Sequence, residues 1–214
     1  MTKQILVVSV SPRGSESASR TIARKLDAKL REDYPDAKFV YRDLADDPLP
    51  HLDSHVLKAI ASRDLKEIEE NHQSARLSDK LTEELLASDL LVIATPMWNF
   101  GIPSLLKAWI DLVVRPGKTF QYAKAGVEGL AQGKRAILVI ASGGVFTDGP
   151  WKPWDFVEPY LRQILKFVGI EDVQTIRVEG LNLPSLADMA VPNAERAIGK
   201  LVLSGQGLQS SASH

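Results

Sequence analysis

Cysteine is missing from this chain of 214 residues. Its absence excludes disulfides, thiolate metal sites and cysteine nucleophiles, including those of the cysteine-dependent phosphatases. A chain without cysteine is consistent with a reducing compartment. Histidine is sparse as well, with four residues in polar or charged stretches, and the sequence predicts no metal site.

Long apolar runs and an excess of one charge are also missing. A membrane span needs about 20 apolar residues. The run at residues 5–10 is much shorter, and it lacks the cleavage site of a signal peptide. Lys and Arg total 26 against 27 Asp and Glu, so there is no basic excess for a nucleic acid. We therefore expect a cytoplasmic protein without membrane or nucleic-acid partners.

What the chain does contain is an alternation of short apolar runs with amphipathic or charged segments. The runs are rich in β-branched residues, which is typical of strands buried on both faces of a parallel sheet. Strands are predicted at residues 5–10, 39–41, 90–94, 135–141 and 173–178. Helices are predicted from Ile22 to near Tyr34 and at residues 56–70, 78–87, 103–114, 155–168 and 187–203.

This alternation predicts an α/β fold with helices on both faces of the sheet. Right-handed crossovers and five strands favour a flavodoxin-like doubly wound parallel sheet of order 2-1-3-4-5. No linker divides the chain, so we expect one domain over residues 1–204, with a disordered tail at 205–214. Residues 118–133 are predicted to be irregular, and residues 142–153 to form a Gly/Pro-rich loop.

Ligands of such sheets bind beyond the carboxyl ends of the strands, where three loops have unusual compositions. The first loop, at residues 11–19, contains neither G-x-G-x-x-G nor a P-loop motif. It carries serines that lead into a helix N-terminus, among them Ser11, Ser17 and Ser19. Free N–H groups and hydroxyls at that end suit a phosphate. Plain N-capping by serine is the alternative interpretation.

The loops after the third and fourth predicted strands complete this edge. The third-strand loop holds Met97, Trp98, Asn99 and Phe100, a set that suits a planar heterocycle with polar edges. The fourth-strand loop reads Ala141, Ser142, Gly143 and Gly144, whose glycines allow close approach of the backbone to a ligand. A hydrophobic lid and an ordinary tight turn are the alternatives for these two loops.

At these residues the chain resembles the FMN-dependent NADH-azoreductases, also described as NAD(P)H:quinone oxidoreductases, over about residues 3–203. The most specific match is the run from Pro96 to Pro103, followed by residues 106–111. Further matches are residues 117–120 with Tyr122, residues 128–130, and residues 142–144 with 148–150. Trp98 stands where the family usually has Tyr, and Ser142 where it often has Arg.

The resemblance implies FMN bound without a covalent link and a nicotinamide donor, NADH or NADPH. Electrons then pass to quinones or azo compounds in a ping-pong cycle that needs no catalytic side chain, since the flavin carries the chemistry. The phosphate would lie against Ser11, Ser17, Ala18 and Ser19. The ring would contact Met97, Trp98, Asn99 and Phe100, with Ala141, Ser142, Gly143 and Gly144 on its other side.

The resemblance also implies a homodimer with its pocket at the subunit interface. Tyr122 and Phe167 are then candidate walls of the substrate pocket, with Phe167 contributed by the partner, although ordinary packing explains both residues equally well. Two other functions stay open at this point. One is a flavodoxin-type electron carrier that turns over NAD(P)H poorly, and the other is an α/β binding module without flavin.

Overall fold

A five-stranded parallel sheet forms the centre of the molecule in the computed structural model, which describes residues 2–61, 72–124 and 126–202. Its strands are β1 (Gln4–Ser9), β2 (Lys38–Asp43), β3 (Leu90–Pro96), β6 (Arg135–Ala141) and β7 (Asp172–Val178). They are hydrogen-bonded in the order β2-β1-β3-β6-β7, and every pair is parallel. The flavodoxin-like order predicted from the sequence is confirmed, with β6 and β7 as the fourth and fifth strands.

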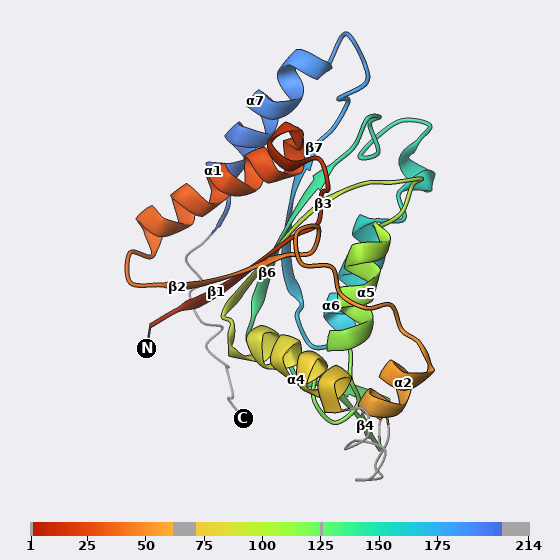
Figure 1. The fold of residues 1–214 in the computed structure, drawn as a ribbon. Coiled ribbons are helices and arrows are strands. Elements are labelled where there is room, and N and C mark those ends of the chain that lie inside the picture. Colours follow the sequence, from red (N-terminus) through yellow and green to blue (C-terminus); the bar gives the residue numbers. More distant parts are fainter. Residues whose placement is uncertain (1, 62–71, 125, 203–214) are drawn as a thin grey trace, which may run out of the picture.

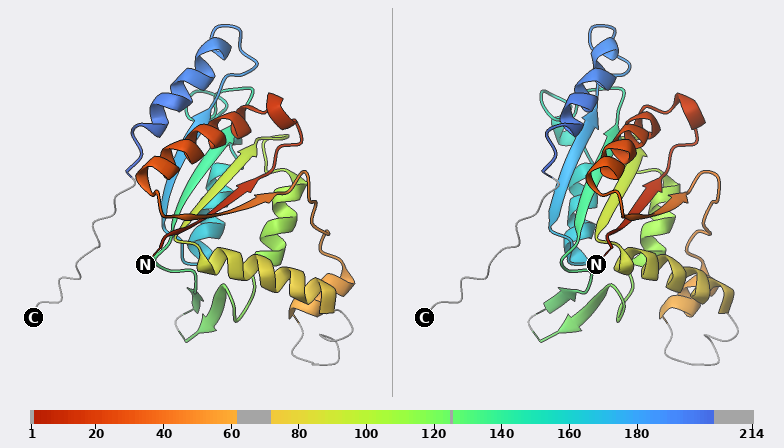
Figure 2. Two further views of the ribbon diagram at one scale, coloured as in Figure 1. Left: turned by 60° about the vertical axis from the view of Figure 1, so that its left-hand side comes forward. Right: turned by 90° about the vertical axis from the view of Figure 1, so that its left-hand side faces the viewer.

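Helices cover both faces of this sheet (Figure 1). Helices α1 (Ala18–Asp33) and α7 (Ala187–Ile198) pack on one face, and α4 (His72–Ala87), α5 (Ser104–Val113) and α6 (Glu158–Phe167) lie on the other. In Figure 1 the sheet lies between these two layers, and the right-hand view of Figure 2 shows its strands side by side behind α1 and α7. The short helix α2 (Ser54–Ala61) lies beside α4 at the amino end of the sheet.

Side-chain alternation along the strands explains why they read as continuous apolar runs. In β1, Ile5 and Val7 belong to the core under α1 and α7, whereas Leu6 and Val8 belong to the core under α4, α5 and α6. All four are buried, because successive side chains of a strand point to opposite faces and both faces are covered. Helices hold the sheet from both faces, and its parallel strands β1, β3 and β6 place their carboxyl ends along one edge.

The prediction that residues 118–133 are irregular is wrong. They contain an antiparallel hairpin of β4 (Phe120–Ala123) and β5 (Gly126–Gly129), with Phe120 opposite Gly129. Two strands of four residues are too short to show a clear alternation of polar and apolar side chains, and β5 both begins and ends with glycine. A hairpin of this size is stabilised by what it packs against, which the sequence does not display locally.

Several predicted boundaries move by a few residues. The predicted helix at 155–168 begins at Glu158, because the Asp155 carboxylate accepts the N–H groups of Val157 and Glu158 and so caps the first turn. Within the predicted loop at 142–153, a short 3₁₀ turn, η2, begins at Lys152 and ends at Trp154. Helix α7 ends at Ile198, before Gly199.

Other predictions extend beyond the described residues. The predicted helix at 56–70 is confirmed as far as the end of α2, and the rest of it lies outside the described part of the chain. The predicted disordered tail at 205–214 lies outside it as well. One domain over residues 1–204 stays a prediction.

Candidate functional site

The loops after β1, β3 and β6 meet at the carboxyl edge of the sheet and enclose a cavity of about 420 Å³. We call it the serine cavity. Ser11, Ser17, Ala18, Met97, Trp98, Ala141, Ser142 and Gly143 line it, as do Arg13, Glu16, Pro96, Leu181 and Asn182. Eight of the predicted site residues therefore meet at one place, although they are spread over more than 120 positions of sequence.

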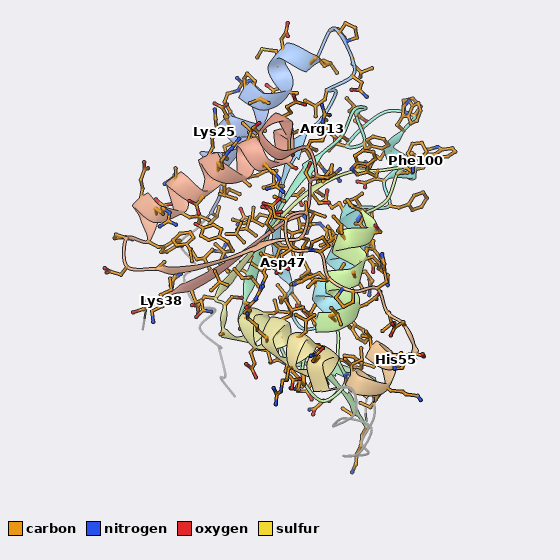
Figure 3. All side chains as sticks on the ribbon, viewed as in Figure 1. Arg13, Lys25, Lys38, Asp47, His55 and Phe100 are labelled. Atoms are coloured by element: carbon orange, nitrogen blue, oxygen red, sulfur yellow. The ribbon has the colours of Figure 1, made fainter. Side chains whose placement is uncertain are left out.

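A second cavity of about 670 Å³ adjoins the first, and we call it the aromatic cavity. Both cavities share Met97, Gly143 and Asn182. Its remaining lining residues are Asn99, Phe100, Gly144, Val145, Phe146, Asp148, Gly149, Pro150, Trp151 and Leu183. Figure 3 shows Arg13 and Phe100, one from each cavity, at the same end of the sheet, with His55 at the opposite end.

The loop after β1 presents hydroxyls and free N–H groups to the serine cavity. Ser17 caps α1, since its Oγ accepts the N–H of Arg20 at 3.3 Å. Its hydroxyl also lies 3.0 Å from that of Ser19, which is fully buried and does not line the cavity. Ala18 and Ser19 occupy the first turn, where a helix leaves its N–H groups without an internal acceptor. Capping and anion binding are therefore compatible at this helix end.

Arg20 holds this loop in place. Its Nε donates to the backbone oxygen of Ser11 at 2.8 Å, and both terminal nitrogens donate to the carboxylate of Asp43 at the end of β2. The hydrogen bonds to Asp43 raise the pKa of Arg20. Burial by itself would raise the pKa of Asp43, but the hydrogen bonds from Arg20 and from the Ala45 N–H bring that pKa below its usual value. Arg20 is paired with Asp43 and does not line the cavity. The basic side chain that does line it is Arg13, which is exposed.

The loop after β3 contains a tight turn with an uncommon backbone. Trp98 and Gly101 exchange two hydrogen bonds, at 3.0 and 2.9 Å, and the residues between them both have positive φ. These are Asn99 at 46° and Phe100 at 68°, in the left-handed region that residues with a Cβ rarely adopt. The N–H of Met97 donates to Ala141 of β6 at 2.7 Å, which anchors the turn. Strain of this kind is concentrated at functional sites.

Gly143 lies at the junction of the two cavities. The position requires glycine, because no side chain fits there. A Cβ on Gly143 would lie 2.4 Å from Nδ2 of Asn182, which follows β7. The Asn182 N–H donates to the Gly143 oxygen at 3.0 Å, and the Ser142 N–H donates to Val178 of β7. Ser142 turns its hydroxyl to the oxygen of Gly144. Asn182 was not among the predicted site residues, although it lies in a Gly- and Pro-bearing loop after the last predicted strand.

Aromatic rings from two distant loops form the wall of the aromatic cavity, which Phe100, Phe146 and Trp151 line and which Trp154 supports by packing against Phe100. The Phe100 ring lies 5.9 Å from Trp151, 5.1 Å from Trp154 and 6.2 Å from Phe146, measured between ring centroids. Trp151 and Trp154 are each 52% exposed, so half of their surface is open to a ligand or to solvent. Trp151 and Trp154 lie in or beside the predicted Gly/Pro-rich loop and were not among the predicted site residues.

Tyr122 and Phe167 lie elsewhere. Tyr122 is in β4 and is 79% exposed, while Phe167 ends α6 and packs against Phe120 at 4.7 Å. The β4–β5 hairpin lies at the amino end of the sheet, opposite the end that carries the loops after β1, β3 and β6 (Figures 1 and 2). Neither residue lines the serine cavity or the aromatic cavity of its own chain.

The described residues contain neither a cluster of metal ligands nor a membrane-spanning helix. Within them, no group of three or more His, Cys, Asp or Glu side chains is placed to hold a metal ion. Across the same residues, no helix combines the length and apolarity that crossing a membrane requires.

Comparison with known proteins identifies the family. A family model described as a flavodoxin-like fold matches residues 3–202. The chain is 66% identical over 201 residues to an FMN-dependent NADH:quinone oxidoreductase of Beijerinckia indica, covering 94% of this chain and all of the relative. The chain belongs to this family. A member from Agrobacterium fabrum is 43% identical over 198 residues, covering 92% of this chain and 97% of that protein.

Solved structures of similar proteins agree with the family. An azoreductase from Bacillus anthracis str. Sterne superposes with a TM-score of 0.84 at 28% identity, covering 93% of this chain and 98% of that one. An FMN-dependent NADH-azoreductase from the Ames Ancestor strain, solved in complex with FMN, gives a TM-score of 0.81 at 25% identity. That match covers 93% of this chain and 99% of the other.

Proposed function

We propose that this chain is an FMN-dependent oxidoreductase that passes electrons from NADH or NADPH to quinones and azo compounds. The observation that carries the proposal is the pair of joined cavities, one lined by hydroxyls and helix N–H groups and the other by aromatic rings. A phosphorylated, flat ring system needs both kinds of surroundings side by side. Relatives with 66% and 43% identity carry the name of this activity.

The residues present fit FMN. Ser11, Ser17 and the N–H groups of Ala18 and Ser19 would hold its phosphate. Ser19 would contribute its backbone N–H only, because its hydroxyl is buried against Ser17. The ring would lie along the strained turn and the fourth-strand loop. Its neighbours there are Met97, Trp98, Asn99, Phe100, Ala141, Ser142, Gly143 and Gly144. Gly143 leaves open the passage that a side chain would close.

The bound flavin supplies two-electron chemistry that protein side chains lack. The chain binds and orients it, and its aromatic wall excludes water from one side of the cavity. Asn99, Gly143 and Gly144 line the cavity, and their backbone N–H groups would stabilise negative charge on a ring bound there. Donor and acceptor occupy the aromatic cavity in turn, which gives ping-pong kinetics.

The functional unit in this proposal is a cytoplasmic homodimer. Tyr122 and Phe167 lie at the far end of the sheet from their own cavities, so they reach a substrate pocket only in an assembly that brings one subunit's hairpin to the partner's cavities. The 79% exposure of Tyr122 leaves its ring available for such a contact.

An absorbance spectrum of the purified protein, followed by anaerobic titration with NADH and NADPH, tests the proposal. We expect a flavin spectrum that bleaches within seconds of mixing and returns when a quinone is added. A protein that stays colourless and takes up no added FMN would be a binding module instead. A flavin spectrum that NADH and NADPH fail to bleach would identify an electron carrier. Initial rates at several fixed acceptor concentrations should give parallel double-reciprocal lines if the kinetics are ping-pong.

A further inference from the structure

Residues 146–156 form a loop that supplies Phe146 and residues 148–151 to the lining of the aromatic cavity, and we call this loop the arch. Glu179 holds its first foot, Phe146 and Thr147. The Glu179 carboxylate accepts the N–H groups of Phe146 at 2.8 Å and Thr147 at 3.1 Å, and the Thr147 hydroxyl at 2.6 Å. Only 12% of the Glu179 side chain is exposed. Hydrogen bonds to a charged acceptor that is shielded from water are among the stronger ones in proteins.

Arg177, near the end of the edge strand β7, holds the second foot, Asp155. Its guanidinium donates to the carboxylates of Asp155 and Glu158, with the Nε bond to Glu158 at 3.0 Å. Asp155 in turn caps α6 through the N–H groups of Val157 and Glu158. The side chains of Arg177 and Asp155 are 11% and 7% exposed. Nη1 of Arg177 lies 3.9 Å from a carboxylate oxygen of Glu179, so the two charged groups that hold the feet are neighbours.

Between its feet the arch is held mainly by aromatic contacts. The hydrogen bonds that the structure gives to residues 149–154 are local to the arch: Lys152 donates to Gly149, Trp154 to Trp151 and Asp155 to Lys152. The rings of Trp151 and Trp154 lie against Phe100, and the Phe156 N–H donates to the Phe100 oxygen at 3.0 Å. The positions of the Trp151 and Trp154 rings therefore depend on where the two feet of the arch are held.

We propose that Arg177 and Glu179 are positioning residues for the acceptor: by fixing the feet of the arch, they hold the Trp151 ring in place for a flat aromatic acceptor to pack against. This proposal rests on the proposed function. An arch that is ordered before binding spares the acceptor the entropic cost of ordering it. Loosening the arch should therefore raise the KM for the acceptor and leave kcat and FMN content unchanged.

Steady-state kinetics of Glu179→Gln and Arg177→Lys with NADH and a quinone tests this. Both changes keep the approximate size of the side chain and weaken the hydrogen bonds to the feet. Because these substitutions weaken the hydrogen bonds without removing them all, we expect the quinone KM to rise about tenfold, which corresponds to about 1.4 kcal/mol. Flavin absorbance per protein should match the unaltered enzyme.

Asp172→Asn is the matched control. Asp172 begins the same strand and pairs with Arg135 at the opposite end of the sheet, so its loss removes an ion pair without touching the arch. Its quinone KM should equal that of the unaltered enzyme. If Arg177→Lys does not fold, Thr147→Val removes only the hydroxyl that donates to Glu179 and should give a smaller rise in the same KM.

Two results would overturn the proposal. One is a quinone KM that is unchanged in Glu179→Gln and is also unchanged in the single variant Arg177→Lys or Thr147→Val. The other is loss of FMN in step with the rise in KM, which would make these residues part of cofactor binding. Failure of the proposed function looks different, because the unaltered enzyme would then not reduce the quinone at all, and both proposals would fall together.

Discussion

At the scale of single residues, the site depends on positions where the backbone comes unusually close to another group. Gly143 is the clearest case, since Asn182 occupies the space that a Cβ would need. Asn99 and Phe100 are the second case, because both are held at positive φ by the hydrogen bonds that close their turn. Such strain persists only where the surrounding structure fixes it.

Gly143→Ala should weaken FMN binding. The added methyl group displaces the Asn182 side chain into the passage between the two cavities, and overpacking of this kind costs about 1–3 kcal/mol. We expect a roughly tenfold or greater rise in the Kd for FMN, measured by titrating FMN-free protein. The double variant Gly143→Ala with Asn182→Ala relieves the clash and should recover part of the affinity. An FMN affinity equal to that of the unaltered chain would contradict this account.

Ser17→Ala should reduce both stability and FMN affinity. Removing the hydroxyl deprives the Arg20 N–H of its acceptor, and loss of such a cap costs about 1 kcal/mol. Urea unfolding of the FMN-free protein measures the first effect, and FMN titration the second. Ser15→Ala is the control, because Ser15 is exposed and lines neither cavity. If only the stability falls, Ser17 is a helix cap and nothing more.

At the scale of elements, the hairpin shows how two neighbouring aromatic residues can have different roles. Phe120 is buried and lies between the rings of Phe167 and Tyr122, at 4.7 and 5.7 Å. Tyr122 faces outward at 79% exposure. The first therefore joins the hairpin to α6, and the second is free to contribute to a subunit contact.

Substitution to alanine should separate these two roles. Phe120→Ala should lower the free energy of unfolding by about 3–5 kcal/mol, the usual cost of emptying a buried aromatic site. Tyr122→Ala should change it by no more than about 0.5 kcal/mol, as for other exposed positions. If the hairpin of one subunit lines the partner's pocket, Tyr122→Ala should nevertheless raise the acceptor KM. An acceptor KM that does not change would remove Tyr122 from the substrate pocket.

At the scale of the whole molecule, ion pairs join segments that are distant in sequence, and they set the response to acid. The pKa values of Asp43, Asp79 and Glu158 are lowered in the folded protein. Burial opposes this direction in each case, and hydrogen bonds from cationic and other donors overcome it. Arg20 acts on Asp43, Lys118 and Arg115 act on Asp79, and Thr175, Arg177 and Arg162 act on Glu158.

These shifts predict acid lability. Each folded pKa lies below its unfolded value, so the unfolded chain binds more protons and stability falls as the pH drops. The ordinary values are 3.8 for Asp and 4.5 for Glu, so the contribution is complete well above them and is lost as the pH falls through the folded values. Urea unfolding from pH 7 to pH 3 measures this, and Asp79→Asn should flatten the curve. A free energy that stays constant down to pH 3 would refute it.

Much of this protein could be read from its sequence. Apolar runs and helical spacing located all five strands of the sheet and the helices between them, because a double-sided core requires continuous apolar strands. Parallel strands end at one edge, so Ser17, Met97 and Gly143 could be expected near each other before any coordinates existed.

Only the tertiary structure decided which side chains meet at that edge and which do not. Asn182 against Gly143, and Phe100 against Trp154, are contacts between loops whose paths depend on the packing of the elements beneath them. The β4–β5 hairpin could not be predicted from the sequence, because its strands are short and gain their stability from packing against α6. Local propensity determines helices and strands, whereas contacts between distant loops depend on long-range packing that no single segment records.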